Sequence, residues 1–270
     1  MPKLFAIFGD PVSHSRSPLM HNYLFQALHV DACYTRVHLT DGSKLRDTFF
    51  SLGLSGANIT VPHKEAAYEA CDEVRGFATT IGVVNTIILE DGKLIGYNTD
   101  ADGFMEAIKP FGTLKTVLIL GAGGTAKALA NRFLQDGYQV NVLNRSEERL
   151  NYFKDLDLSC EVPLMCDTWK SFVCKSYDLV VNTTSAGLKD DLYPAPKTMI
   201  EEILSHTTYV ADAIYGKLTP FLLLAKQKEL NYKDGADMLL YQGVLANHLF
   251  CEKQFDLKTT ADFMQKSFLL

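Results

Sequence analysis

Residues 116–134, TVLILGAGGTAKALANRFL, give the strongest indication of the fold. The strand-like run TVLIL leads into GAGGTA (121–126), which fits the pattern G-x-G-x-x-A, and an alanine-rich helical segment follows. Glycines there allow a tight turn and let backbone N–H groups approach a pyrophosphate, and the helix N-terminus favours the anion. A second strand, QVNVL (139–143), completes a βαβ order that predicts a Rossmann domain. The alternative is a glycine-rich turn that binds nothing. The residues of the expected phosphate loop are Gly121, Ala122, Gly123, Gly124 and Thr125.

The end of the second strand indicates which dinucleotide is bound. An acidic residue at this position would hydrogen-bond the ribose hydroxyls of NAD. This chain instead has Asn144-Arg145-Ser146, with Arg149 one turn later. Guanidinium groups hold a 2′-phosphate through forked, charge-assisted hydrogen bonds, whereas a carboxylate would repel it. We therefore expect NADP; the alternative is that Arg145 and Arg149 belong to a solvated face.

The composition is ordinary for a globular protein of 270 residues, with 47% hydrophobic and 21% charged residues. A net charge of −6 without a basic run argues against a nucleic-acid partner. No apolar stretch reaches the roughly 18–20 residues that cross a bilayer. We expect no signal peptide, because the apolar part of MPKLFAIFGDP (1–11) is too short for one. The six cysteines show no CxxC pair and no metal-ligand spacing with the seven histidines. We expect a cytoplasmic protein with free thiols, no metal site and no membrane partner.

Short apolar runs alternate with helical patterns, which predicts an α/β fold with mostly parallel sheets. The residues EDG (90–92) predict a hairpin, so the first sheet is mixed. From residue 115 the order becomes regularly βαβ, and this change predicts two domains divided near residues 101–110 and again near 235. The expected strands besides 116–120 and 139–143 are 4–8, 33–39, 57–61, 83–89, 93–97, 178–182 and 209–214.

Helices are expected from Ser17, from about residue 146, over 221–230 and over about 236–252. Ser17 precedes a proline, and serine is a preferred N-cap while proline is preferred in the first turn. Together with Ser15 it would place two hydroxyls at a helix N-terminus, which also suits a carboxylate ligand.

The segment GANITVPHKE (56–65) places Lys64 where a strand-like run ends and a helix begins. A cation suits the first turn of a helix poorly, so Lys64 is either a solvated surface lysine or one placed for its charge. Reducing a ketone leaves negative charge on oxygen, which a lysine can protonate or stabilise. Asp100, in YNTDADGF, is the candidate partner carboxylate. The alternative for Asp100 is helix capping, a role that Thr99 or Asp102 could equally fill.

Polar residues interrupt two of the expected strands. Asn58 and Thr60 are two residues apart and therefore share a strand face. Asn85 lies within VVNTII, where an unpartnered buried amide would cost about 1–3 kcal/mol. These side chains would suit a substrate rich in hydroxyl groups; the alternative is that they bond to neighbouring backbone.

Together these motifs resemble shikimate dehydrogenase of the shorter, biosynthetic type. The resemblance runs through nearly the whole chain in the family's order. The matching stretches are FGDPVSHSRSPLMHN (8–22), LSGANITVPHKE (54–65), GVVNTI (82–87), GYNTDADGF (96–104), GAGGTAKA (121–128), NRSEER (144–149), DAIYGKLTP (212–220) and DGADMLLYQG (234–243).

The resemblance implies a discontinuous α/β substrate domain (1–104 with 236–270), a Rossmann NADP domain (105–235) and a cleft between them. It also implies NADPH-dependent interconversion of 3-dehydroshikimate and shikimate in aromatic amino-acid biosynthesis. Lys64 and Asp100 would be the catalytic pair, and we expect a monomer or a homodimer. The implied substrate contacts are Ser15 and Ser17 to the carboxylate, and Asn58, Thr60, Asn85, Tyr215 and Gln242 to the hydroxyls and ring. The implied cofactor contacts beyond the phosphate loop are Gly235 near the nicotinamide, and Asn144, Arg145, Ser146 and Arg149 around the adenosine phosphate.

The chain departs from the family pattern without losing a catalytic group. His63 stands where many members carry phenylalanine, and Ala213 stands where a larger apolar residue often faces the nicotinamide. Two alternative functions remain: a dehydrogenase of quinate or a related polyol acid, and a non-catalytic NADPH-binding sensor. Lys64, Asp100 and Asn85 argue against the sensor, which needs no proton-transfer group.

Overall fold

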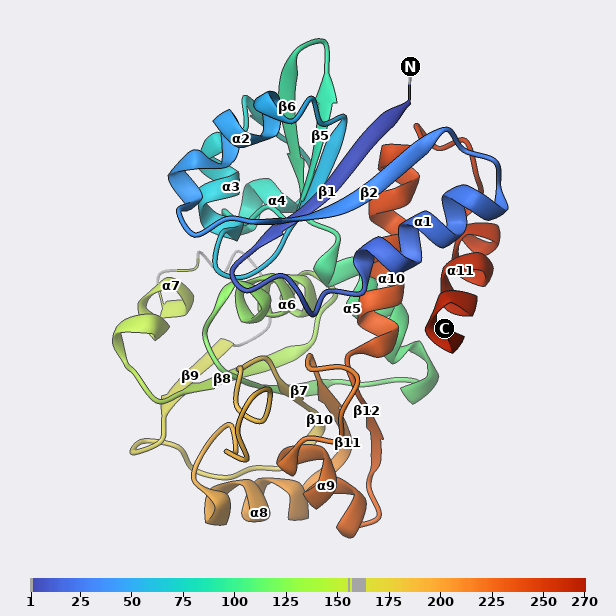
Figure 1. The fold of residues 1–270 in the computed structure, drawn as a ribbon. Coiled ribbons are helices and arrows are strands. Elements are labelled where there is room, and N and C mark those ends of the chain that lie inside the picture. Colours follow the sequence, from blue (N-terminus) through green and yellow to red (C-terminus); the bar gives the residue numbers. More distant parts are fainter. Residues whose placement is uncertain (1, 155, 157–163) are drawn as a thin grey trace. The chain divides into compact units, whose positions relative to one another are not determined.

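The computed structural model describes residues 2–154, 156 and 164–270 (Figure 1). The chain divides into two compact units, each built around a six-stranded sheet. The first unit contains the chain up to Gly103 together with Leu240–Leu270, and the second contains Phe104–Leu239. The protein is therefore a two-domain α/β protein, and its first domain is discontinuous in sequence.

The first unit contains a mixed sheet with the strand order β2-β1-β3-β5-β6-β4. β1 pairs in parallel with β2 and β3, whereas β5 pairs antiparallel with β3 and β6. The β5–β6 pair is the hairpin expected around EDG (90–92). The strands are β1 (Lys3–Gly9), β2 (Ala32–His38), β3 (Gly56–Ile59), β4 (Glu73–Val74), β5 (Thr86–Glu90) and β6 (Lys93–Tyr97).

Helices cover both faces of this sheet, because β1 is apolar on both faces and successive strand residues point to opposite sides. Phe5 stacks on Phe250 of α10 with ring centroids 4.6 Å apart, whereas Ala6 and Phe8 pack in a cluster with Phe49 of α2. In Figure 1, α2 and α3 lie on one side of the sheet and α1, α10 and α11 on the other. The helices are α1 (Ser17–Ala27), α2 (Leu45–Ser51), α3 (Lys64–Ala70), α4 (Phe77–Ile81), the later part of α10 (Ala236–Phe250) and α11 (Leu257–Lys266).

The second unit contains a fully parallel sheet with the order β12-β11-β10-β7-β8-β9. This is the doubly wound order, and its topological switch point lies between β7 and β10. The strands are β7 (Thr116–Leu120), β8 (Gln139–Asn144), β9 (Leu164–Thr168), β10 (Tyr177–Asn182), β11 (Thr207–Asp212) and β12 (Asn231–Lys233). The helices are α6 (Gly124–Gln135), α7 (Asn151–Lys154), α8 (Lys197–Ser205) and α9 (Pro220–Gln227); α5 (Asp100–Ile108) connects the two units.

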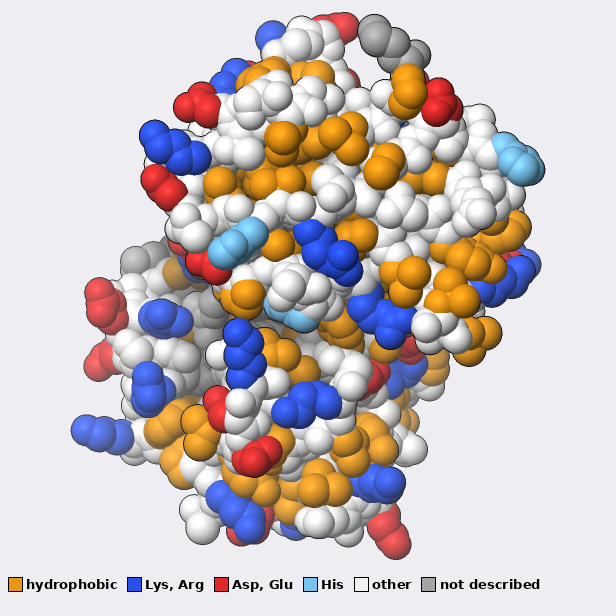
Figure 2. All heavy atoms as spheres, in the orientation of Figure 1, with side chains coloured by type: hydrophobic (Ala, Val, Ile, Leu, Met, Phe, Trp, Pro, Cys, Tyr) orange, Lys and Arg blue, Asp and Glu red, His pale blue; other side chains and the backbone are white. Residues whose placement is uncertain are grey.

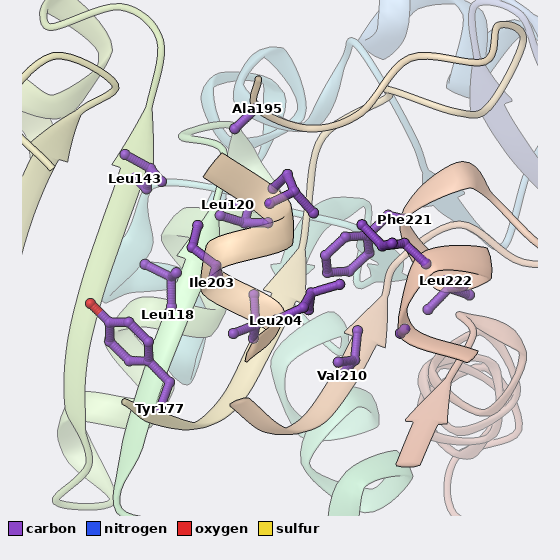
Figure 3. Close-up of a cluster of buried hydrophobic side chains, with 14 residues drawn as sticks. Leu118, Leu120, Leu143, Tyr177, Ala195, Ile203, Leu204, Val210, Phe221 and Leu222 are labelled. Atoms are coloured by element: carbon purple, nitrogen blue, oxygen red, sulfur yellow. The ribbon is translucent and has the colours of Figure 1, made fainter. Parts of the chain in front are cut away.

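A buried apolar cluster holds α8 and α9 against the second sheet (Figure 3). Leu118 and Leu120 of β7 lie in this cluster with Ile203 and Leu204 of α8 and Phe221 of α9, and each is at most 1% exposed. Burying a large apolar side chain contributes about 1.5–3 kcal/mol. The cluster therefore fixes β7, and with it the glycine loop that follows.

Two expectations about local structure were wrong. Ser17 is the first residue of α1, but the cap position is occupied by Arg16, whose side chain makes no capping bond. Arg16 has near-helical dihedrals, so the Ser17 N–H instead donates to Ser15 Oγ at 3.3 Å. Asn85 lies before β5 and not inside it, because its side chain bonds to the segment that follows β6.

The helix expected from about residue 146 begins later. The chain leaves β8 through a turn in which Asn144 Nδ2 donates to the Ser146 carbonyl, and a 3₁₀ turn (Glu148–Leu150) precedes α7. The short strands β4, β9 and β12 had no clear sequence signal, because edge strands of this length carry too little periodicity.

None of the described helices has the length and apolar character needed to cross a membrane. Across the same described residues, His, Cys, Asp and Glu side chains form no group that could hold a metal ion. Five of the cysteines are free thiols, and Cys160 lies outside the described residues. Figure 2 shows Lys and Arg side chains interspersed with Asp and Glu over the visible face.

Candidate active site

Lys64 and Asp100 form an ion pair in the first unit. Each is the first residue of a helix, Lys64 of α3 and Asp100 of α5. Lys64 Nζ lies 2.5 Å from Asp100 Oδ2, and the two side chains are 14% and 9% exposed. Taking two such charges out of water is costly, so the pair is better explained by a use for its charge than by stability. The pair is therefore mostly buried but keeps some contact with solvent.

Asn85 holds the other oxygen of the same carboxylate. Its Nδ2 donates to Asp100 Oδ1 at 2.9 Å and to Thr99 Oγ1 at 3.0 Å, while its Oδ1 accepts from the Thr99 N–H at 2.8 Å. Asn85 is 2% exposed, so these bonds satisfy an amide that would otherwise be costly to bury. The orientation of Asp100 is therefore set from both sides, by an ammonium and by an amide.

Thr99 links this network to the C-terminal part of the first unit. Its hydroxyl donates to the Gln242 carbonyl at 3.1 Å, a contact between residues 143 positions apart. Gln242 lies on α10 and is half-buried. The structure therefore brings the Gln242 backbone next to the Asn85–Thr99–Asp100 cluster.

Asn58 lies deeper in the same sheet and is bonded within the protein. Tyr34 OH donates to Asn58 Oδ1 at 2.7 Å, and Asn58 Nδ2 donates to Thr86 Oγ1 at 3.0 Å. Burial raises the pKa of Tyr34 well above its ordinary value, although its hydrogen bonds with Ser17 and Asn58 lower it, so its hydroxyl stays a donor. Thr60 follows the end of β3 and is half-buried.

Ser15 and Ser17 place two hydroxyls side by side at the start of α1. Their Oγ atoms are 3.3 Å apart, and the residues are 5% and 2% exposed. The loop is held from behind by Arg36, whose guanidinium donates twice to the Ser15 carbonyl, at 2.6 and 3.2 Å. Ser15 Oγ also accepts the Ser17 N–H, and two adjacent hydroxyls at the start of α1 suit a ligand carboxylate.

The glycine loop joins β7 to α6 in the second unit. Gly121 has φ +107°, and a Cβ there would meet Thr183 Oγ1 at 2.8 Å, so its glycine is required by the fold. Gly123 has φ −89°, and a Cβ there would meet no protein atom within 4 Å. Neither conformation nor packing requires glycine at 123. A ligand backed against the N-terminus of α6 would require it, so this loop fits a dinucleotide pyrophosphate.

Two basic residues follow β8, the strand that pairs with β7. Asn144 ends β8, which pairs with β7, and Ser146 is half-buried beyond it. Arg145 and Arg149 are exposed, and neither forms an ion pair with another described residue. Two such guanidinium groups at the end of the second strand fit a 2′-phosphate.

Gly235 and Tyr215 also lie in the second unit. The Gly235 N–H donates to the Ile214 carbonyl at 2.9 Å, and a Cβ at Gly235 would overlap the Ala213 carbonyl. Tyr215 is half-buried in the loop between β11 and α9.

Sequence reasoning missed several residues of the first-unit network. Thr99 was weighed only as a helix cap, although its position next to Asp100 was a usable signal. Tyr34 and Thr86 carry no local signal, because each meets Asn58 only through strand pairing.

Known proteins resemble both units. Residues 7–87 match the family model described as shikimate dehydrogenase substrate binding domain, and residues 116–166 match one described as NADP oxidoreductase coenzyme F420-dependent. A relative from Helicobacter hepaticus named shikimate dehydrogenase (NADP(+)) is 44% identical, over 97% of this chain and 98% of its own. One of the same name from Helicobacter pylori is 40% identical, over 98% and 99%. A Thermus thermophilus shikimate 5-dehydrogenase, solved in complex with NADP(H) and shikimate, superposes with a TM-score of 0.83 at 32% identity, over 98% of this chain and 99% of that one.

Proposed function

Because the chain belongs to the NADP-dependent shikimate dehydrogenase family, we propose that Lys64 and Asp100 are its catalytic pair. The enzyme interconverts 3-dehydroshikimate and shikimate, a step of aromatic amino-acid biosynthesis, and its cofactor is NADP. The similarities do not favour a quinate dehydrogenase or a non-catalytic sensor. The observation that supports the catalytic pair is the 2.5 Å contact between Lys64 Nζ and Asp100 Oδ2, with Asp100 Oδ1 held by Asn85.

The residues divide the chemistry between them. NADPH, when bound, supplies a hydride to the ketone carbon, and the oxygen takes up one proton to become the alcohol of shikimate. Lys64 gives that proton or stabilises the developing negative charge, a role that arginine could not fill because it does not release a proton. Asp100 keeps the ammonium in place through Oδ2 and orients the reacting hydroxyl. Asn85 and Thr99 hold Asp100 in turn.

The remaining assignments extend this proposal. Residues 1–104 with 236–270 bind the substrate, and residues 105–235 bind NADP. Ser15 and Ser17 receive the substrate carboxylate, a role supported by their paired, buried hydroxyls. The other proposed substrate contacts are Asn58, Thr60, Asn85, Tyr215 and Gln242. The proposed cofactor contacts are Gly121, Ala122, Gly123, Gly124, Thr125, Asn144, Arg145, Ser146, Arg149 and Gly235.

We further infer that the enzyme works in the cytoplasm, as a monomer or a homodimer. Free thiols among the described cysteines support a reducing compartment. Light scattering coupled to size-exclusion chromatography measures the oligomeric state, and a trimer or larger assembly would contradict this proposal.

Lys64→Ala tests the catalytic pair in an NADPH absorbance assay with shikimate and NADP. We expect kcat to fall by about 10²–10⁴-fold with a smaller change in KM, because a general acid acts mainly in the transition state. Lys258→Ala is the matched control. Lys258 also lies in the first turn of a helix and pairs with Asp262 at 3.3 Å, but its side chain is 88% exposed. Normal turnover in Lys64→Ala would remove this lysine from the chemistry.

A further inference from the structure

A buried carboxylate that the catalytic proposal does not use ends β11 in the second unit. Asp212 is 1% exposed. Its Oδ1 accepts from Asn182 Nδ2 at 3.1 Å and from the Ile214 N–H at 2.9 Å, and its Oδ2 accepts from Thr219 Oγ1 at 2.7 Å. Asn182 ends the neighbouring strand β10, so this network lies at the carboxyl edge of the sheet, where doubly wound folds bind their ligands.

The donors to Asp212 come from both ends of one loop. Residues 213–218 leave β11 and return to α9, which begins at Pro220 after the cap residue Thr219. Ile214 lies at the start of this loop and Thr219 at its end. The Thr219 hydroxyl also accepts from the Leu222 N–H at 3.3 Å, so it joins the loop end to the helix as well. One carboxylate therefore closes the loop that carries Tyr215.

A second segment holds the loop from its other side. The Gly235 N–H donates to the Ile214 carbonyl at 2.9 Å, and the Gly216 N–H donates to Asp234 Oδ2 at 3.4 Å. Asp234 is the charged group of this segment that acts on Asp212. Lys217, on the loop itself, reaches the Leu188 carbonyl, and Lys233 pairs with Asp237. No cation among these neighbours neutralises Asp212 within the described network.

We propose that Asp212 is a positioning residue that closes the loop 213–218 and so holds Tyr215 in place for turnover. This inference rests on the substrate contact proposed for Tyr215. Asn182 and Thr219 share in the closure, Asn182 by fixing the carboxylate and Thr219 by tying it to α9.

The closure depends on pH. Burial raises the pKa of Asp212 to about 6, and the repulsion of Asp234 adds to this, against the lowering effect of the hydrogen bonds from Ile214, Thr219 and Asn182. Ionised Asp212 accepts hydrogen bonds from three donors. Opening the loop would return the carboxyl group to water and lower its pKa towards the ordinary value, so the closed loop is favoured as pH falls through about 6 and weakened as pH rises.

Asp212→Asn tests the proposal with the full chain, because asparagine keeps the shape but removes the charge and replaces one of the two acceptor oxygens with an N–H₂ donor. We expect the backbone amides of the loop to exchange hydrogen about tenfold faster and kcat/KM for shikimate to fall about tenfold. Binding of adenosine 2′,5′-bisphosphate, a probe of the residues around Arg145, should stay unchanged. In the wild type, exchange of the loop amides, corrected for the intrinsic rate, should slow as pH falls from 7 to 5, and in the variant it should not.

Asp178→Asn is the matched control. Asp178 Oδ2 also accepts three bonds, from the Lys115 and Thr116 N–H groups and Thr116 Oγ1, but at the opposite, amino-terminal edge of the same sheet. It should lower the melting temperature and leave kcat/KM and loop exchange unchanged.

The outcomes separate this inference from the proposed function. The inference would be overturned if the loop amides of Asp212→Asn exchanged at the wild-type rate. It would also be overturned if the control Asp178→Asn lowered kcat/KM as much as Asp212→Asn does. If Asp212→Asn does not fold, the pH series on the wild type still decides: flat loop exchange between pH 7 and 5 overturns the closure. Normal turnover in Tyr215→Phe would instead contradict the substrate contact proposed for Tyr215, without contradicting the closure of the loop by Asp212.

Discussion

At the scale of single residues, the first-unit site is a chain of bonds that ends on one carboxylate. Lys64 and Asn85 each take one oxygen of Asp100, and Thr99 joins Asn85 to the Gln242 carbonyl. Such a network holds a reacting group within a narrow range of positions, and a shift of about 1 Å can cost about 10²-fold in rate.

Asp100→Asn should reduce kcat by about 10²-fold or more. The amide keeps the shape but loses the charge that holds the Lys64 ammonium, and its N–H₂ group faces another donor. Steady-state kinetics measures the change, with Asp262→Asn, in the exposed Lys258 pair, as the control that should retain wild-type turnover. A kcat within threefold of the wild type would contradict the role of Asp100.

Arg145→Ala should weaken NADPH binding by about 10–100-fold and leave NADH binding nearly unchanged. Hydrogen bonds to charged groups contribute about 1.5–3 kcal/mol each, and NADH lacks the 2′-phosphate that Arg145 would hold. Titration of both cofactors by fluorescence measures the two affinities. An equal loss for both would assign Arg145 to a solvated face, the alternative that the sequence left open.

At the scale of elements, the loop between β7 and α6 contains two glycines, Gly121 and Gly123, that are needed for different reasons. Gly121 adopts a positive φ and packs against Thr183, whereas Gly123 has an ordinary φ and open space beside it. The fold itself therefore requires the first glycine, whereas we propose that cofactor binding requires the second.

Gly123→Ala should leave the melting temperature within a few degrees of the wild type and weaken NADP binding by at least about tenfold. Gly121→Ala should lower the melting temperature, because alanine is strained at this φ and meets Thr183. Differential scanning calorimetry with and without NADP separates the two effects. If Gly123→Ala bound NADP normally, the loop would not hold the pyrophosphate as assigned.

At the scale of the whole molecule, the two units should respond to acid in opposite directions. Burial lowers the pKa of His21, in the first unit, to about 3. The unfolded chain binds this proton near pH 6.5 and the folded unit does not. The free energy of unfolding of the first unit therefore falls by about 2 kcal/mol as the pH is lowered from 7 to 5.

Asp212, in the second unit, has the opposite effect. Its folded pKa of about 6 lies above the unfolded value, so stability that is present at low pH is lost as pH rises. Lowering the pH from 7 to 5 should therefore restore about 1 kcal/mol to the second unit.

Native-state hydrogen exchange resolves the two units, and Trp169, in the second unit, gives a fluorescence signal for that unit alone. Asp212→Asn should abolish the pH dependence assigned to Asp212 without changing that of the first unit. The assignments of His21 and Asp212 would be contradicted if both units lost stability on acidification and the second unit of Asp212→Asn had the same stability as the wild type at every pH.

Local sequence patterns were sufficient to predict those parts of the protein whose residues are contiguous in the chain. The glycine pattern, the strand before it and Arg145 after the next strand predicted the parallel βαβ unit and its cofactor, because a strand–turn–helix is specified by neighbouring residues. The hairpin at 90–92 was predictable for the same reason. Tertiary structure alone decided how side chains distant in sequence meet. Lys64 and Asp100 are 36 residues apart, Tyr34 and Asn58 are 24 apart, and Thr99 reaches the Gln242 carbonyl across 143 residues. These contacts follow from the order of the strands and the return of α10 to the first unit, and both are set by the burial of whole sheet faces and not by any local pattern.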